Sequence, residues 1–128
     1  MKFVLAMDYD GTLFDGEWNS FGSPLIAVIE QAKRFAAHPG CDVILWTCRE
    51  ERLLVEAIDR CGEVGLFFDA VNMNTDETLE WNRRTFGRLG NTCGRKVYAN
   101  LYVDDRAPGS IDHFLSLDPD EEWQKINQ

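Results

Sequence analysis

Short apolar runs that alternate with helical patterns restrict the fold of this 128-residue chain more than any other feature. The runs are a few residues long and are bounded by turn-forming residues, which is typical of strands buried on both faces of a sheet. Between them, apolar residues recur at the spacing of amphipathic helices. This alternation predicts βαβ units, and hence a three-layer α/β/α, Rossmann-like domain with a mostly parallel sheet.

The expected elements follow from these runs and from the residues that bound them. Ser23 followed by Pro24 is a typical start of a helix, with Ser23 as the N-cap and Pro24 at the first helical position. The sequence His38-Pro39-Gly40 is expected to end that helix. The predicted strands are 3–7, 42–47, 66–71 and 98–103. The first predicted helix begins at Pro24, and the second begins within 48–51. Three further helices are predicted over 76–86, 111–115 and 119–126.

Composition restricts the class of protein. Hydrophobic residues make up 45% and charged residues 27% of the chain, so we expect one globular domain over residues 1–128. The net charge of −9 argues against a nucleic-acid partner held by general electrostatic attraction. No apolar stretch approaches the roughly 20 residues of a membrane span, and residues 3–7 are too short for a signal peptide. We therefore expect no membrane partner and a cytoplasmic location, which cysteines without a C-x-x-C pair also favour.

Polar side chains stand at the expected ends of three strands. Asp8 and Asp10 follow the first strand, Thr47 ends the second, and Asp104 and Asp105 follow the last. Ligands of parallel sheets bind outside the carboxyl ends of the strands, so these groups are expected to meet. Crowded carboxylates resist joint ionisation unless a cation lies between them, and Mg²⁺ takes oxygen ligands of this kind. The pattern predicts a metal-assisted phosphoryl-transfer site.

A simpler reading of the first acidic pair is a turn or the start of a calcium loop, because Asp-x-Asp-Gly is common in both. A calcium loop would carry a Glu at its twelfth position, where this chain has Asn19.

Together with Lys96, these polar groups resemble the four motifs of the haloacid-dehalogenase-like (HAD) phosphohydrolase superfamily. The first motif is Asp8-Tyr9-Asp10-Gly11-Thr12, the second is the apolar strand that ends at Thr47, the third is Lys96, and the fourth is Asp104-Asp105. The resemblance spans about residues 1–107. The runs at 45–50, 68–72, 96–100 and 102–106 look like those of a subgroup of small, capless bacterial and phage hydrolases.

The resemblance implies a phosphatase that forms an aspartyl-phosphate. Asp8 would attack phosphorus, which divides one difficult step into two easier ones. Asp10 would protonate the leaving oxygen and then activate water, and like-charge crowding beside Asp8 is expected to favour the protonated Asp10.

The resemblance also implies the ligands of the phosphate and of the metal. Lys96, the Thr47 hydroxyl and the backbone N–H groups from Cys48 onward would bind the phosphate. The residues expected to bind Mg²⁺ are Asp8, the backbone carbonyl of Asp10, and one or both of Asp104 and Asp105, with Asp104 favoured.

Two neighbours of Thr47 leave alternatives open. Arg49 is expected to contact the substrate phosphate or the leaving group, or else to pair with a local carboxylate such as Glu50. Cys48 is expected to be a buried small side chain rather than a nucleophile.

The motif spacing leaves little room for a cap domain, so we expect an open site. An open site in this superfamily accompanies a macromolecular substrate, or a loop or neighbouring subunit of a homo-oligomer that closes over a small one. The acidic charge favours a small phosphate ester, such as a sugar phosphate or a nucleotide, and Trp18 is a candidate contact for it. The alternative function is a phospho-accepting receiver-like module. Receivers place the acceptor after the third strand, whereas here Asp69 is followed by the apolar residues Ala70 and Val71.

Overall fold

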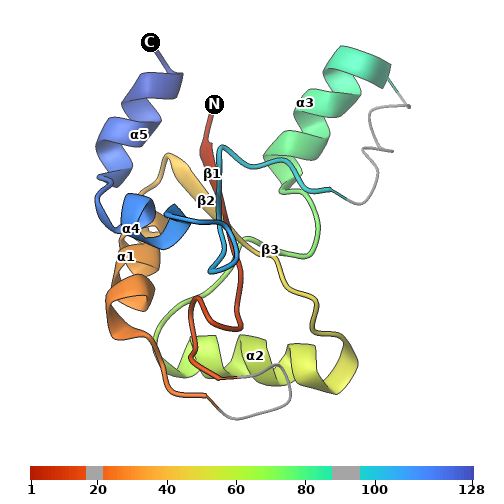
Figure 1. The fold of residues 1–128 in the computed structure, drawn as a ribbon. Coiled ribbons are helices and arrows are strands. Elements are labelled where there is room, and N and C mark those ends of the chain that lie inside the picture. The colour runs from red at the N-terminus through yellow and green to blue at the C-terminus, as the bar shows by residue number, and fades with distance from the viewer. Residues whose placement is uncertain (17–21, 88–95) are drawn as a thin grey trace.

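The computed structural model describes residues 1–16, 22–87 and 96–128, and Figure 1 shows a central sheet with helices on both sides. Within these ranges the sheet has parallel strands in the order β3-β2-β1-β4. The central strands β1 and β2 are buried along their whole length, and Asp42 of β2, which pairs with Lys2, is their one charged residue. The predicted Rossmann-like α/β/α fold with a parallel sheet is therefore confirmed. The strands are β1 (Phe3–Met7), β2 (Cys41–Leu45), β3 (Ala70–Val71) and β4 (Leu101–Val103).

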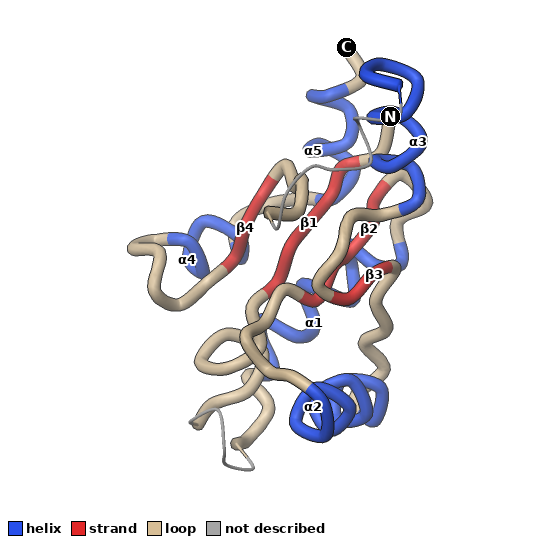
Figure 2. The backbone as a smooth tube through the Cα atoms, turned by 90° about the vertical axis from the view of Figure 1, so that its right-hand side faces the viewer, coloured by secondary structure: helices blue, strands red, loops and turns tan. Residues whose placement is uncertain are grey.

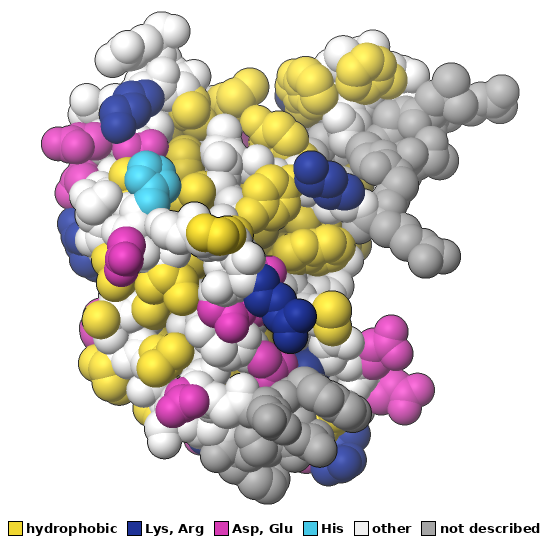
Figure 3. Space-filling model, viewed as in Figure 1, with side chains coloured by type: hydrophobic (Ala, Val, Ile, Leu, Met, Phe, Trp, Pro, Cys, Tyr) yellow, Lys and Arg dark blue, Asp and Glu magenta, His cyan; other side chains and the backbone are white. Residues whose placement is uncertain are grey.

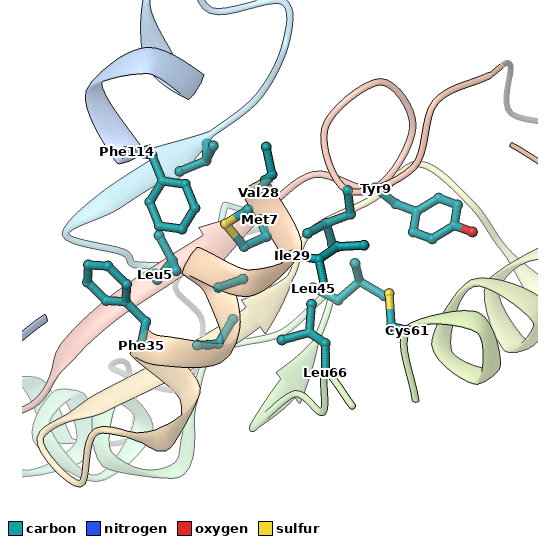
Figure 4. Packing of buried hydrophobic residues seen from close by; sticks show 14 of the residues in the cluster. Leu5, Met7, Tyr9, Val28, Ile29, Phe35, Leu45, Cys61, Leu66 and Phe114 are labelled. Carbon is teal, nitrogen blue, oxygen red and sulfur yellow. The ribbon is translucent and has the colours of Figure 1, made fainter. Parts of the chain in front are cut away.

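One face of the sheet carries the larger apolar cluster, which we call the first core. Leu5 and Met7 of β1 belong to it, and the rings of Phe35 and Phe114 pack there with centroids 5.5 Å apart (Figure 4). Burying each such side chain contributes about 1.5–3 kcal/mol, so this core holds β1 against the helices that pack on it. The helices that contribute to it are α1 (Ile26–Ala37), α2 (Glu51–Glu63), α4 (Ser110–Leu115) and α5 (Pro119–Ile126).

The opposite face carries a smaller cluster of Val4, Ala6, Ile44 and Val97, which we call the second core. The helix α3 (Asp76–Phe86) lies on this side of the sheet in Figure 1. Figure 2, seen from this side, shows the strands side by side, with α3 near the end of β1 where the chain begins. No helix in the described part of the chain is long and apolar enough to cross a membrane.

The predicted bounds 3–7, 76–86 and 119–126 are confirmed, whereas the strands predicted over 66–71 and 98–103 are too long. The first of these shrinks to β3 because the N–H of Leu66 donates to the carbonyl of Cys61, which closes the end of α2. The second shrinks to β4. The prediction for 42–47 is wrong by one or two residues, because the strand β2 ends at Leu45 and leaves Thr47 in the following loop.

Ser23 is not the N-cap that the sequence predicts. The helix α1 begins at Ile26, its N-cap is Leu25, and no side chain caps it. The reason is tertiary: the N–H of Leu25 donates to the carbonyl of Leu13, and that of Asp15 donates to the carbonyl of Ser23. These bonds tie residues 23–25 to the loop after β1. The predicted substrate contact Trp18 lies outside the described residues.

Candidate metal and phosphate site

Three carboxylates meet where β1 and β4 end. Met7 pairs with Val103 in the parallel ladder, and the N–H of Asp8 donates to the carbonyl of Val103 at 2.9 Å. This register places Asp8 beside Asp104 and Asp105. One carboxylate oxygen from each of the three residues lies within 4.8 Å of the others. Of the two early acids that the sequence predicts at this site, Asp8 meets Asp104 and Asp105, whereas the carboxylate of Asp10 is not part of the group.

A buried hydroxyl joins the two strand ends. Thr12, which is 0% exposed, donates from Oγ1 to Oδ2 of Asp8 at 3.3 Å and accepts from the N–H of Asp105 at 3.0 Å. Gly11 allows the Asp105 carboxylate to approach this loop closely. It has a φ of +78°, and a Cβ built on it would overlap that carboxylate. The loop after β1 thus holds both Asp8 and Asp105 in place.

Hydrogen bonds within the turn after β4 orient Asp104. Its Oδ1 accepts from the N–H of Arg106 at 3.0 Å, and its own N–H donates to the Ser110 hydroxyl at 3.2 Å. These bonds leave Oδ2 of Asp104 available to a cation, while Asp105 is exposed at the rim of the cluster. Figure 3 shows acidic side chains at the surface in the middle of the molecule, beside Lys or Arg side chains.

The surroundings of Asp8 shift its pKa. Burial, followed by the negative charge of Asp104, raises the pKa of Asp8 to about 7, and Asp105 adds to the effect. The backbone N–H of Tyr9 and the hydroxyl of Thr12 oppose the rise. The sequence predicted crowding of Asp8 and Asp10, whereas the carboxylates that lie beside Asp8 in the structure are those of Asp104 and Asp105.

Asp10 is held apart from the cluster by Arg49. Nε and Nη2 of Arg49 donate to the two carboxylate oxygens of Asp10 at 2.9 and 2.7 Å. The guanidinium carbon also lies 4.6 Å from the centroid of the Tyr9 ring. Of the two partners expected for Arg49, the structure provides a carboxylate, but that of Asp10 rather than that of Glu50.

The loop after β2 is shaped by hydrogen bonds that leave the Thr47 hydroxyl free to donate. Oγ1 of Thr47 accepts from the N–H of Arg49 at 3.1 Å, and the N–H of Thr47 donates to Oδ1 of Asn72 at 2.8 Å. Asn72 adopts a φ of +52°, a conformation that asparagine tolerates better than most residues. The expected burial of Cys48 is wrong, because Cys48 is exposed in this loop.

Lys96 lies on the same side of the sheet as the second core. Its Nζ is 5.4 Å from the centroid of the Tyr102 ring, and Tyr102 pairs with Ala6 in the ladder. Asp8 and Asp104 stand two residues beyond this pair. No ion pair joins Lys96 to the three carboxylates within the described ranges. The ammonium group of Lys96 therefore lies over the Tyr102 ring, one residue before the end of β4.

Sequence reasoning assigned no role to two residues that organise this site. Thr12 was part of the first motif. The pattern that could have identified it is a hydroxyl residue that follows an acidic pair at the end of a strand. Asn72 follows the short strand β3, where an asparagine commonly forms a turn. Neither pattern identifies the partner, because Asp105 and Thr47 come from distant parts of the chain.

The donor set fits a hard divalent cation and a phosphate. Three carboxylate oxygens on adjacent strand ends are ligands that Mg²⁺ prefers. The Thr47 hydroxyl and the start of α2 offer donors to an anion beside them. A cation held by these carboxylates would reduce their repulsion toward an anionic phosphate that binds beside them.

Comparison with known proteins supports the fold. No protein-family model matches the chain, and no curated protein is significantly similar to it. A solved structure of a conserved protein from Bacteroides thetaiotaomicron is similar over 99% of this chain and 91% of its own, with 28% sequence identity and a TM-score of 0.68. The Rossmann-like architecture is thus shared with a protein of closely matching length.

Proposed function

We propose that this protein is a Mg²⁺-dependent phosphomonoesterase of the HAD type that acts through an aspartyl-phosphate at Asp8. The observation that carries the proposal is the convergence of Asp8, Asp104 and Asp105 within 4.8 Å at the carboxyl ends of adjacent parallel strands. The order of the motifs along the chain supports the same assignment.

The charge of this cluster favours a cation. Burial, and after it the repulsion from Asp104 and Asp105, raise the pKa of Asp8 to about 7, and a bound cation would offset both costs. Asp8, Asp104 and the exposed Asp105 would hold Mg²⁺, and the backbone carbonyl of Asp10 is a further candidate ligand. When bound there, Mg²⁺ would offset the negative charge of the carboxylates and of the phosphoryl oxygens.

The first step transfers the phosphoryl group to Asp8. A carboxylate oxygen of Asp8 attacks phosphorus, the bond from phosphorus to the ester oxygen breaks, and that oxygen takes a proton from Asp10. The Thr47 hydroxyl, the N–H of Cys48 and the ammonium of Lys96 stabilise the charge on the phosphoryl oxygens.

The second step releases phosphate and restores both acids. Asp10 takes a proton from water while the water oxygen attacks phosphorus, and the bond between phosphorus and Asp8 breaks. The products are orthophosphate, ionised Asp8 and protonated Asp10, which is ready for the next ester.

The placement of Asp69 supports a phosphatase over a receiver-like module. Asp69 precedes β3, and its Oδ2 accepts from the N–H of Val43 at 2.7 Å, in the middle of β2. Its carboxylate is thereby engaged away from the strand ends where Asp8 lies. A small phosphate ester such as a sugar phosphate or a nucleotide is the proposed substrate, and the free thiols of Cys41, Cys48 and Cys61 suit a cytoplasmic enzyme.

The test is hydrolysis of an aryl phosphate by the purified protein with and without Mg²⁺. We expect turnover that a chelator removes and that Asp8→Asn lowers by at least about a thousandfold. Asp59→Asn is the matched control, since Asp59 is an exposed acid on α2 outside the cluster. Turnover that survives both the chelator and Asp8→Asn would overturn the proposal. A panel of phosphorylated metabolites, ranked by rate, would then identify the substrate class.

A further inference from the structure

Arg49 is a buried cation in a loop, which is an unusual position for an arginine. Its side chain is 4% exposed, whereas the side chain of Asp10, to which it donates two hydrogen bonds, is 24% exposed. Tyr9, whose ring lies under the guanidinium, is 2% exposed and stacks on Phe14. The guanidinium is thus enclosed by a carboxylate on one edge and an aromatic ring on one face.

A buried charge is retained only when its partners replace the lost water. Two parallel N–H bonds to one carboxylate are the strongest and most directional arrangement that an arginine makes. These bonds use Nε and Nη2, and the Tyr9 ring shields the face. An arginine held this way has little surface to offer to a phosphate that approaches from solvent.

We infer that Arg49 is a positioning residue for Asp10 and not a ligand of the substrate phosphate. The inference rests on the proposed phosphatase function and assigns a role within that same site. The pair fixes the direction of the Asp10 carboxylate. On the open side each of its oxygens keeps a further lone pair, which can hold the proton that Asp10 gives to the leaving oxygen and takes back from water. Arg49 acts on the chemistry only through this carboxylate.

A second bond couples the same residue to the phosphate-binding loop. The N–H of Arg49 donates to the Thr47 hydroxyl at 3.1 Å, while its side chain holds Asp10. Arg49 therefore sets the separation between the phosphate donor Thr47 and the acid Asp10, which come from the loops after β2 and β1. Misplacing a reacting group by about 1 Å can cost on the order of a hundredfold in rate.

The first test is steady-state kinetics of Arg49→Gln in the full-length chain with Mg²⁺ and an aryl phosphate. We expect kcat to fall about 10- to 100-fold, with KM changed less than about twofold, and Arg49→Lys to restore part of the loss. Arg52→Gln is the matched control, because Arg52 is an exposed arginine in the first turn of α2, three residues further along the chain, and it pairs with Glu56. A rise in KM with kcat unchanged would identify a substrate ligand and overturn the inference.

The second test does not need turnover and protects against a variant that fails to fold. Removing both partners of a buried pair is better tolerated than removing one. The affinity of orthophosphate in the presence of Mg²⁺ is therefore compared by calorimetry between Asp10→Asn and the double variant Asp10→Asn with Arg49→Gln. Affinities within about threefold support the inference, and a loss of tenfold or more would contradict it. If neither variant nor wild type binds or hydrolyses phosphate, the proposed function itself has failed.

Discussion

The backbone N–H of Asp105 donates to the hydroxyl of Thr12 across 93 positions of sequence, at 3.0 Å. The same hydroxyl donates to the carboxylate of Asp8. One buried oxygen therefore connects the proposed nucleophile to the acidic turn after β4. The geometry of the candidate metal site depends on this connection as much as on the ligands themselves.

Thr12→Val should loosen the metal site while leaving the fold intact. The substitution keeps the shape of the side chain but leaves the N–H of Asp105 without its acceptor, which costs about 1–3 kcal/mol in the free energy of unfolding. We also expect Mg²⁺ affinity to fall about 10-fold or more. Thr12→Ser retains the hydroxyl and serves as the control, and equal affinities for Thr12→Val and wild type would contradict the role of this bond. Denaturant unfolding and calorimetry measure the two effects.

Gly11→Ala should displace Asp105. The residue combines a positive φ of +78° with a position where a Cβ overlaps the Asp105 carboxylate. Gly109→Ala is a matched control, because Gly109 has a φ of +77° and no atom within 4 Å of the added Cβ. Both variants should lose about 1 kcal/mol of stability through backbone strain. Mg²⁺ titration should show weakened binding for Gly11→Ala alone.

The raised pKa of Asp8 predicts a pH-dependent loss of stability in the metal-free protein. Unfolding returns the pKa of Asp8 to near 3.8, whereas in the folded protein the pKa is about 7. Between these values the unfolded chain is ionised at Asp8 while the folded protein keeps the proton, so the free energy of unfolding falls as pH rises through this window. Below the lower value Asp8 contributes no such penalty.

Asp8→Asn should remove this component of the pH dependence. We expect the metal-free variant to be more stable than wild type at pH 8 by about 1–3 kcal/mol, and the difference to vanish near pH 4. Mg²⁺ should raise the melting temperature of wild type more at pH 8 than at pH 5, since its ligands must be ionised. Thermal unfolding checks both, and a variant less stable than wild type at pH 8 would refute the assignment of the pKa shift.

Asn72→Gly should weaken the loop that carries Thr47. Glycine accepts the positive φ of this position but removes the acceptor of the Thr47 N–H. We expect a loss of about 0.5–1.5 kcal/mol in stability and weaker inhibition by orthophosphate. Asn72→Asp keeps an acceptor in place and should retain the stability that Asn72→Gly loses, which denaturant unfolding can establish.

The sequence predicts well which side chains follow the strand ends, because the burial of apolar runs and the order of the strands along the chain determine them. A continuous apolar run such as 3–7 has one way to be buried, and parallel strands bring their carboxyl ends to the same edge. Asp8, Asp104 and Asp105 could be grouped on this basis alone. The helices predicted over 76–86 and 119–126 are also confirmed, and in the structure the side chains of Thr75 and Asp118 cap their first turns.

What the sequence could not predict depends on partners far along the chain. The N-terminal signal at Ser23 is overridden by the pairing of residues 23–25 with the loop after β1. Arg49 was expected to meet phosphate or Glu50, because nothing local indicates that Asp10 lies across the site. The exposure of Cys48 likewise could not be predicted from the residue type, because an unpaired cysteine is commonly buried.

The most direct test of the account is to find the phosphoryl group on the protein. Asp10→Asn should slow hydrolysis of the intermediate, so acid quenching after mixing with Mg²⁺ and an activated aryl phosphate should trap a phosphorylated chain. Mass spectrometry of the intact protein and of its peptides should then show one phosphoryl group, carried by Asp8 and absent without Mg²⁺. A phosphoryl group on any other residue, or product formation with no phosphorylated chain in this variant, would contradict the account.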